Sequence, residues 1–369
     1  MAIGVSTHSS ADSLEATAAA AARGTIHVIN PLWDAQGGAD WRAIEMYKTL
    51  DPAYPVRLWS RFDPAPVFRE RYRVELIRPW LGRWPIGGTF VFVGAYFRVG
   101  HWFKAAFPRR TILVYNTYQP DRFVKALARL EAWHCTPVEV VYTSPLLRRL
   151  SHRPGPVIES PIDLHKFAPA ATSARRASPF TVGRLSRDLA SKHHRDDPAV
   201  YNALAQAGVA LRVMGGTCLR ARLEPPAVAG VVAAGAQRTV DFLHDLDCFY
   251  YRTSDQWLEA FGRVVFEAMA CGLPVVCGRR GGYADYIAHG VNGFLFDTNE
   301  QAIALILKLR ADPALRERIG RAARRTVEDL YRSRAWQNKL AFFLPPEREA
   351  RRMPSFGDAF DPTPSQILR

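Results

Sequence analysis

Two successive series of short apolar runs constrain the fold of this 369-residue chain more than any other feature. The runs are apolar throughout rather than alternating, which is typical of parallel strands buried on both faces of a sheet. Each run is separated from the next by a stretch that can hold a crossover helix. The pattern predicts two α/β domains, each with a doubly wound parallel sheet. The first series comprises Ile26–Asn30, Phe90–Val93, Thr111–Tyr115 and Val138–Tyr142, and the second comprises Phe180–Gly183, Leu211–Gly216, Cys248–Tyr251 and Pro274–Cys277.

Changes in composition indicate the domain boundaries. Hydrophobic periodicity disappears in the Pro-, Ala-, Ser- and Arg-rich passage between Phe167 and Pro179, where we expect the interdomain linker. We predict a disordered leader over residues 1–23, an N-terminal Rossmann-like domain over 24–165, and a C-terminal Rossmann-like domain over 166–330. A last amphipathic helix is expected within 331–345, and a flexible tail over 346–369.

Charge and cysteine content limit the class of protein. The net charge is +14, and residues 69–129 hold twelve lysines and arginines against three acidic residues. Such a field attracts anions, whether phospholipid headgroups, acidic glycans or nucleic acid. The five cysteines form no C-x-x-C pair, and neither a signal peptide nor an apolar run of about 20 residues is found. These features predict a cytoplasmic protein with no metal centre that can bind peripherally to the cytosolic face of a membrane.

The stretch Arg98–Arg110 is one candidate for membrane contact. On a helix it would place Trp102, Phe103, Ala106 and Phe107 on one face, with cations around them. This face could simply cover the sheet, or it could dock on an anionic bilayer. The second alternative would bring the N-terminal domain to a lipid-linked acceptor.

The segment Glu259–Pro274 carries the chemistry. Gly262 is expected in a loop and the helix after it begins at about Arg263, ending at a glycine–proline stop. Exposed N–H groups at this helix start would form an anion site that suits a diphosphate. Of the carboxylates of Glu259 and Glu267, one can then bind the hydroxyls of a sugar and the other those of a ribose.

This spacing of two glutamates resembles the signature of the retaining glycosyltransferases of family four, the group 1 glycosyl transferases. Further stretches are similar to motifs of that family and extend the resemblance over roughly residues 160–297. They are Pro161–Phe167, Val182–Ser186 with Lys192, Gly281–Asp285, and Gly290–Leu295. The resemblance implies the GT-B fold, in which two facing Rossmann-like domains enclose a cleft.

Several roles follow from the resemblance, residue by residue. The N-terminal domain would bind the acceptor and the C-terminal domain the donor. Arg184 and Lys192 would neutralise the diphosphate of the donor, and Gly183 and Gly215 would also belong to the donor-binding site. Glu267 would hold the ribose, and Glu259 the transferred sugar, helped by the backbone of Phe261, Gly262 and Arg263. Charge that accumulates on the leaving diphosphate would be stabilised by these cations and the helix start. The reaction would therefore need no metal and no cofactor beyond a UDP- or GDP-linked sugar.

The N-terminal side of the site is less defined. The family places a histidine after a strand there, whereas this chain has Asn116 after Thr111–Tyr115 and a histidine, His101, in the preceding unit. Either residue could face the reacting sugar. The pair Gly37–Gly38 matches the first glycine loop of the family and would let a ligand approach the backbone closely.

The other conspicuous features have simpler interpretations. His193 and His194 are adjacent, so their side chains do not converge on one ion, and we interpret them as a solvated loop pair. The glycine pair Gly281–Gly282 follows a buried strand, where ligands of parallel sheets bind, and we favour a donor-binding role for it.

The sequence predicts a transferase that moves a hexose from a nucleoside-diphosphate sugar to a hydroxyl acceptor with retention, in surface polysaccharide or glycolipid synthesis. The predicted partners are the nucleotide sugar, a hydroxyl acceptor such as a lipid-linked saccharide, and an anionic membrane, but no nucleic acid. A nucleotide-sugar epimerase of the same architecture is one alternative. The other is a non-enzymatic, basic protein that binds nucleic acid or lipid, although no nucleic-acid module is found.

Overall fold

The first domain is built on a six-stranded parallel sheet. In a computed structural model, which describes residues 24–52, 54–133, 137–170 and 179–344, its strand order is β3-β2-β1-β4-β5-β6. Successive strands are added on one side of β1 up to β3 and on its other side from β4 onward. Ligands of such sheets bind outside the carboxyl ends of the strands at this switch point between β1 and β4. The strands are β1 (Ile26–Ile29), β2 (Val56–Ser60), β3 (Val74–Leu76), β4 (Thr89–Val93), β5 (Arg110–Tyr115) and β6 (Val138–Tyr142).

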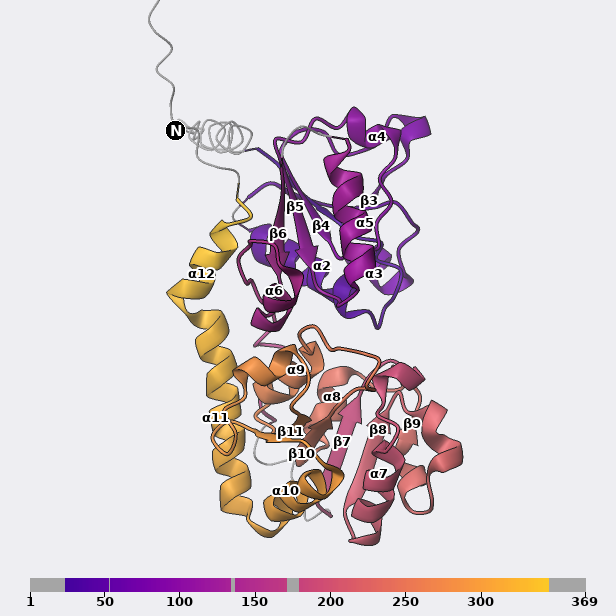
Figure 1. Cartoon of the computed structure of the whole chain (residues 1–369), viewed down its shortest axis with the longest axis vertical. Helices are drawn as coiled ribbons and strands as arrows, with labels where there is room; N and C mark the ends of the chain where they lie inside the picture. The colour runs from indigo at the N-terminus through magenta and orange to yellow at the C-terminus, as the bar shows by residue number, and fades with distance from the viewer. Residues whose placement is uncertain (1–23, 53, 134–136, 171–178, 345–369) are drawn as a thin grey trace, which may run out of the picture.

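Helices cover both faces of this sheet (Figure 1). They are α2 (Gly38–Leu50), α3 (Pro66–Arg71), α4 (His101–Lys104), α5 (Pro120–Glu131) and α6 (Pro145–Ser151). Helix α5 shows why the sequence folds this way locally. Pro120 stands in its first turn, and its apolar residues Phe123, Leu127 and Leu130 recur at helical spacing and are buried.

The second domain repeats the same plan. Its strand order is β12-β11-β10-β7-β8-β9, again all parallel, with the switch point between β7 and β10. The strands are β7 (Thr181–Leu185), β8 (Ala210–Met214), β9 (Val231–Val232), β10 (Cys248–Tyr251), β11 (Val275–Gly278) and β12 (Phe294–Phe296). The helices around them are α7 (Asp197–Gln206), α8 (Thr239–His244), α9 (Arg263–Ala270), α10 (Asn299–Ala311) and α11 (Pro313–Arg332).

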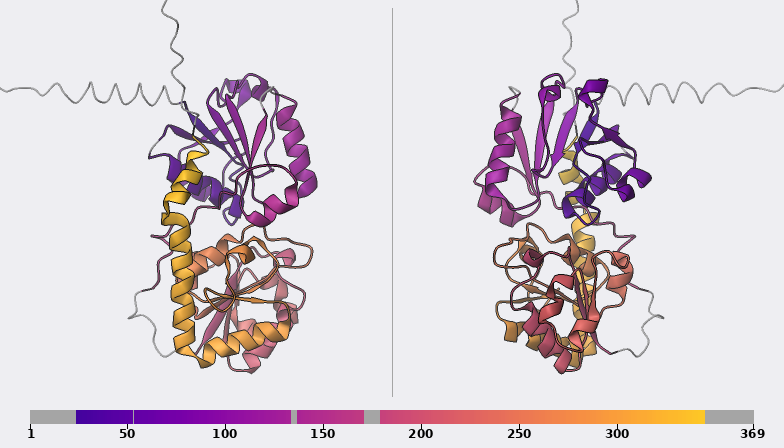
Figure 2. Two further views of the ribbon diagram at one scale, coloured as in Figure 1. Left: turned by 60° about the vertical axis from the view of Figure 1, so that its left-hand side comes forward. Right: turned by 90° about the vertical axis from the view of Figure 1, so that its right-hand side faces the viewer.

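The end of the described chain returns to the first domain. Helix α11 runs along the second domain and is followed by α12 (Arg334–Ala341), which lies beside the first domain in all views (Figures 1 and 2). Trp336 and Phe343 belong to the same buried cluster as Ile26 and Val91. The last helix of the chain is thus part of the core of its first domain.

Both series of predicted strands are found, and each domain contains strands that were not predicted. In the first domain these are β2 and β3, and in the second β9 and β12. The expected leader and tail, residues 1–23 and 346–369, lie outside the described residues. Among the residues described, no helix is long and apolar enough to cross a membrane, and no group of histidine, cysteine and acidic residues could hold a metal ion.

The interpretation of Arg98–Arg110 as an amphipathic docking helix is wrong in its main part. Trp102, Phe103 and Ala106 are buried in the core of the first domain, because α4 turns this face onto the sheet. Only Phe107 projects outward, at 71% exposure.

Candidate active site

A cleft of about 480 Å³ lies between the two domains. This volume is in the range of sites that bind small molecules. Its walls come from loops at the carboxyl ends of the strands in both sheets, including the loops after β1 and β7, at the switch points of the two sheets. Of the predicted site residues, it is lined by Gly37, Gly38 and Asn116 on one side and by Lys192, Glu259, Phe261, Gly262, Arg263 and Glu267 on the other.

Glu259 is held as a charged acceptor on the wall of the second domain. Its Oε2 accepts hydrogen bonds from Nζ of Lys192 at 2.8 Å and from the hydroxyl of Tyr251 at 2.9 Å. Burial opposes ionisation of this carboxyl group, but the Lys192 ammonium and the two hydrogen bonds outweigh it, and the pKa of Glu259 falls below its ordinary value. Because both bonds use Oε2, Oε1 is left to accept hydrogen bonds from a ligand.

The start of α9 lies where the sequence predicted it. Gly262 precedes the helix with φ +85°, a backbone conformation that favours glycine. A Cβ at this position would also lie 2.6 Å from the ring of Tyr283, so there is no space for a side chain. The first turn of the helix presents free N–H groups toward the cleft. Arg263 in this turn bonds Glu267 at 3.2 Å and Ser160 at 2.7 Å, which ties the helix to the segment that joins the domains.

The glycine loop of the first domain faces this helix start. Gly38 begins α2, and a Cβ on it would lie 3.8 Å from Cδ of Arg263 in the other domain. Gly37 has no room for a side chain, because a Cβ would lie 2.3 Å from Oδ2 of Asp40. The loop therefore brings bare backbone to the cleft opposite the predicted diphosphate site.

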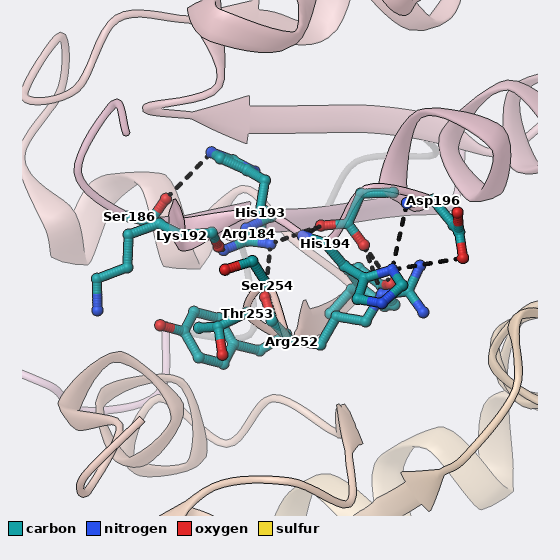
Figure 3. Close-up of polar contacts among 12 residues, drawn as sticks. Arg184, Ser186, Lys192, His193, His194, Asp196, Arg252, Thr253 and Ser254 are labelled. Atoms are coloured by element: carbon teal, nitrogen blue, oxygen red, sulfur yellow. Dashed lines mark hydrogen bonds and ion pairs between the residues drawn. The ribbon is translucent and has the colours of Figure 1, made fainter. Parts of the chain in front are cut away.

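Arg184 does not lie where its predicted role requires. It is completely buried beneath the cleft, and its guanidinium donates to Asp197 at 3.0 Å and to the backbone carbonyls of Arg252 and Lys192 at 2.9 and 2.6 Å (Figure 3). A buried cation that is already paired with a buried carboxylate has no free face for a phosphate. Its position supports the loop that carries Lys192, which does reach the cleft.

Arg187, which was not predicted as a site residue, is an arginine that does reach the cleft. It lines the cleft three residues further along, is about one-third exposed, and pairs with Asp34 of the first domain at 3.3 Å. The sequence signal was present but was missed. In Val182–Ser186 the arginine of the motif lies within the buried strand β7, and the first cation beyond the strand is Arg187.

Other predicted residues lie outside the cleft lining and support it. They are Gly183, Gly215 and the pair His193–His194. A Cβ on Gly183 would lie 2.5 Å from Leu246, so this glycine serves packing within the sheet. Gly215 has φ +82°, and its carbonyl lies 2.8 Å from Nε2 of His193. Burial, with the nearby Arg184 charge, lowers the pKa of His193 to about 4, so the ring is neutral. His193 is thus a buried structural residue and not part of a solvated pair.

The remaining predicted residues lie away from the cleft. His101 is exposed on α4, next to the ring of Trp133, at the end of the first domain remote from the second (Figure 1). Asn116 is therefore the residue that the structure brings to the site. Gly281 and Gly282 also lie outside the cleft lining, although the N–H of Gly282 donates to the carbonyl of Glu259 at 2.8 Å and so fixes its loop.

The cleft lining also includes residues that were not predicted, among them Asp40, Arg42 and Thr143. Arg42 is 1% exposed and donates to the carbonyl of Ile158 at 2.8 Å. Its other guanidinium nitrogens have no partner among the described residues. Asp40 directly follows the glycine loop, which is the signal that could have identified it.

Solved structures share this architecture and confirm the predicted fold. HepE of Anabaena in complex with UDP-glucose superimposes with a TM-score of 0.66 at 17% identity, over 86% of this chain and 98% of that one. WaaG, described as a glycosyltransferase involved in lipopolysaccharide biosynthesis, gives 0.64 at 14% identity, over 86% and 99%. Two six-stranded parallel sheets of equal strand order, facing each other across a cleft, define a GT-B protein.

Residues 233–326 match the model of the family described as glycosyl transferases group 1. The matched segment lies within the second domain and includes Glu259 and Glu267. D-inositol 3-phosphate glycosyltransferase of Geodermatophilus obscurus is 32% identical over 197 residues, which are 46% of this chain and 42% of that protein. Spore coat protein SA of Bacillus subtilis is 38% identical over 87 residues, 23% of this chain and 22% of that protein. The chain thus matches less than half the length of these curated relatives.

Proposed function

We propose that the chain transfers a hexose from a nucleoside-diphosphate sugar to a hydroxyl acceptor, with retention of the anomeric configuration. The observation that carries this proposal is the Glu259–Lys192 pair, which lies beside the start of α9 and opposite the glycine loop of the other domain. A carboxylate suited to sugar hydroxyls and a helix start suited to phosphate therefore lie in one ligand-sized cleft, which supports the proposal.

The chemical step requires stabilisation of the leaving group. When the bond from the sugar to the diphosphate breaks, negative charge accumulates on the diphosphate oxygens. Lys192, Arg187 and the N–H groups at the start of α9 supply fixed positive charge there, and such preorganised groups are worth several kcal/mol in a transition state. We assign the ribose to Glu267, which lies in the same helix and lines the cleft.

Glu259 would act on the sugar itself. Its Oε2 is held by Lys192 and Tyr251, which orient Oε1 toward the cleft. A fixed carboxylate oxygen can accept hydrogen bonds from sugar hydroxyls and fix the ring for attack by the acceptor. Retention follows from the family, in which the acceptor attacks on the face from which the diphosphate departs.

The experiment that tests this proposal combines binding and turnover. Among UDP, GDP and ADP, one nucleotide should raise the melting temperature, because a ligand that binds only the folded state stabilises it. UDP-glucose is the first donor to try, since it is bound in the HepE structure. Glu259→Gln should retain nucleotide binding and lose on the order of 10²-fold in turnover. Normal turnover by this variant would refute the role of Glu259, and conversion of the donor sugar without an acceptor would indicate an epimerase.

We further propose that the first domain contacts an anionic membrane, through a surface other than the one predicted. Ile86 and Phe107 are 61% and 71% exposed, and the backbone bond from Gly87 to Ala106 makes them neighbours. The exposed cations Lys104 and Arg109 flank them. Exposed apolar side chains within a basic region are the combination that binds anionic lipid surfaces.

A further inference from the structure

Three polar side chains in the N-terminal wall of the cleft each contain a buried oxygen with no hydrogen-bond partner among the described residues. The atoms are Oδ1 of Asp40, Oδ1 of Asn116 and Oγ1 of Thr143. Asp40 is 4% exposed and Thr143 is 1% exposed. Buried polar atoms are nearly always paired in native proteins, so three exceptions in one wall of a cleft point to a ligand that pairs with them.

Strand pairing places two of these side chains next to each other. Tyr115 pairs with Tyr142 at the carboxyl ends of β5 and β6, and the N–H of Thr143 donates to the carbonyl of Tyr115 at 3.3 Å. Asn116 and Thr143 are the next residues beyond the two strands. They therefore occupy adjoining positions at the floor of the cleft.

The start of α2 also lies close to Asn116. A Cβ built on Gly94, just after β4, would lie 3.2 Å from Oδ1 of Asn116 and 3.9 Å from Cβ of Ala39. Ala39 immediately precedes Asp40. The loops after β4 and β5 and the first turn of α2 thus meet where the unpartnered oxygens lie.

This place faces the donor domain at the loop of Glu259. Ser144, the residue after Thr143, donates from Oγ to the carbonyl of Ala260 at 2.6 Å, and Ala260 follows Glu259. The unpartnered oxygens of the first domain therefore lie across from the carboxylate that we assign to the transferred sugar. A molecule that attacks this sugar has to approach from their side.

We propose that Asp40 and Thr143 bind hydroxyl groups of the acceptor beside the one that attacks, so that the acceptor is a sugar or polyol rather than a simple alcohol on an apolar frame. This inference rests on the proposed function. Carboxylate and threonine oxygens accept hydrogen bonds from vicinal hydroxyls, which a simple alcohol does not offer.

The ionisation of Asp40 agrees with this role. Burial, and next the charge of Asp34, raise the pKa of Asp40 to about 7, while backbone amides of the loop act in the opposite direction. Asp34 itself pairs with Arg187 of the donor domain, and Lys192 on that wall is paired with Glu259. Asp40 is therefore the acidic residue of the first-domain wall that is left to accept hydrogen bonds from a ligand near neutral pH.

A local role of Asp40 in shaping the glycine loop makes a different prediction. Oδ2 lies over Gly37, where it can serve the loop at the start of α2, while Oδ1 is the atom without a partner. Asp40→Asn keeps the size and an accepting oxygen, so it preserves the loop and removes only the charge. A purely structural role would leave acceptor binding by this variant unchanged.

The test measures acceptor binding by the full chain in the presence of UDP. Saturation-transfer NMR should detect methyl α-D-glucopyranoside or glycerol, but not 1-propanol, on the wild-type protein. Asp40→Asn should weaken glucoside or glycerol binding at least tenfold, and Thr143→Val about fivefold. With UDP-glucose as donor, the same variants should raise the acceptor KM by these factors while donor hydrolysis by water stays within twofold. The acceptor KM of the wild type should fall as the pH rises through about 7 and be flat in Asp40→Asn.

Thr111→Val is the matched control. Thr111 is also a buried threonine whose Oγ1 has no partner in the described structure, but it lies at the opposite end of β5, outside the cleft lining. Its variant should bind and transfer like the wild type. Equal binding of 1-propanol and glucoside, wild-type binding by both cleft variants, or a parallel loss of hydrolysis and transfer would overturn the inference. Failure of the proposed function would instead appear as an absence of nucleotide binding and of donor turnover in the wild type.

Discussion

The guanidinium of Arg187 lies 3.3 Å from the carboxylate of Asp34, and the two residues stand on opposite walls of the cleft. Each side chain is about one-third exposed. An ion pair of this kind contributes only about 0–1 kcal/mol, because water screens it. A diphosphate that enters the cleft can therefore replace Asp34 as the partner of Arg187 with little loss of free energy.

Arg187→Ala should weaken binding of UDP about tenfold and leave the melting temperature of the free protein unchanged. The reason is that Arg187 supplies positive charge to the bound ligand but contributes little to the stability of the fold. Titration calorimetry with UDP measures the first quantity and thermal unfolding the second. Arg279→Ala, which removes an exposed ion pair with Asp297 elsewhere in the same domain, is the control. Unchanged UDP affinity in Arg187→Ala would remove this residue from the donor site.

Arg184→Ala should show the opposite behaviour. It leaves the buried carboxylate of Asp197 with one cation fewer and removes the donor that binds the carbonyls of Arg252 and Lys192, so the free energy of unfolding should fall by about 3–5 kcal/mol. Chemical denaturation measures this loss. Arg184→Ala with wild-type stability and weakened UDP binding would restore the role that the motif predicted for Arg184.

The raised pKa of Asp40 should appear in the pH dependence of stability. An acid whose pKa rises on folding, here from 3.8 to about 7, stabilises the native state below the lower value and loses this contribution as the pH rises through the higher one. The unfolding free energy of Asp40→Asn relative to wild type should therefore increase between pH 4 and pH 8, by roughly 4 kcal/mol. Urea unfolding at the two pH values measures it, and Asp51→Asn on the same helix is the control. A pH-independent difference would refute the shift.

Trp336→Ala should destabilise the first domain although Trp336 follows the second domain in sequence. The indole is 5% exposed within the cluster that contains Ile26, and loss of a buried aromatic side chain typically costs about 3–5 kcal/mol. Hydrogen exchange should show faster opening of β1 and β4 than in the wild type. Gln337→Ala, at an exposed position of α12, should have no such effect. Faster exchange confined to the second domain would contradict the packing described here.

Replacement of Ile86 and Phe107 by serine should reduce binding to anionic liposomes about tenfold at low salt, because it removes the exposed apolar side chains but none of the cations. Co-sedimentation with phosphatidylglycerol vesicles measures this. Val291→Ser changes an equally exposed apolar residue of the second domain, at 57% exposure, and should bind like the wild type. Lack of binding by the wild type would end the membrane proposal.

The sequence predicted the two sheets and the start of α9 because these depend on local patterns. Runs of buried residues specify parallel strands, and Gly262 permits the backbone conformation that precedes the helix. The strands β2 and β3 lie at one edge of their sheet, and β3 contains only three partly buried residues, so they lack a comparable apolar run.

The sequence could not show which arginine reaches the cleft. Arg184 and Arg187 are three residues apart, and only the end of β7 between them decides that one is buried and the other faces the ligand. Asp40 and Thr143 are separated by more than a hundred residues, and only the sheet order brings their loops to one wall. Such relationships depend on tertiary structure.

The chain crosses between the domains twice, once near Ser160 and again near Ser333, where α11 gives way to α12. Two bodies joined at two points can rotate about the line through both points, but they resist twisting and separation. Opening of the cleft is therefore expected to be a hinge motion about one axis on the side of the connections, so that substrates enter and products leave from the opposite side.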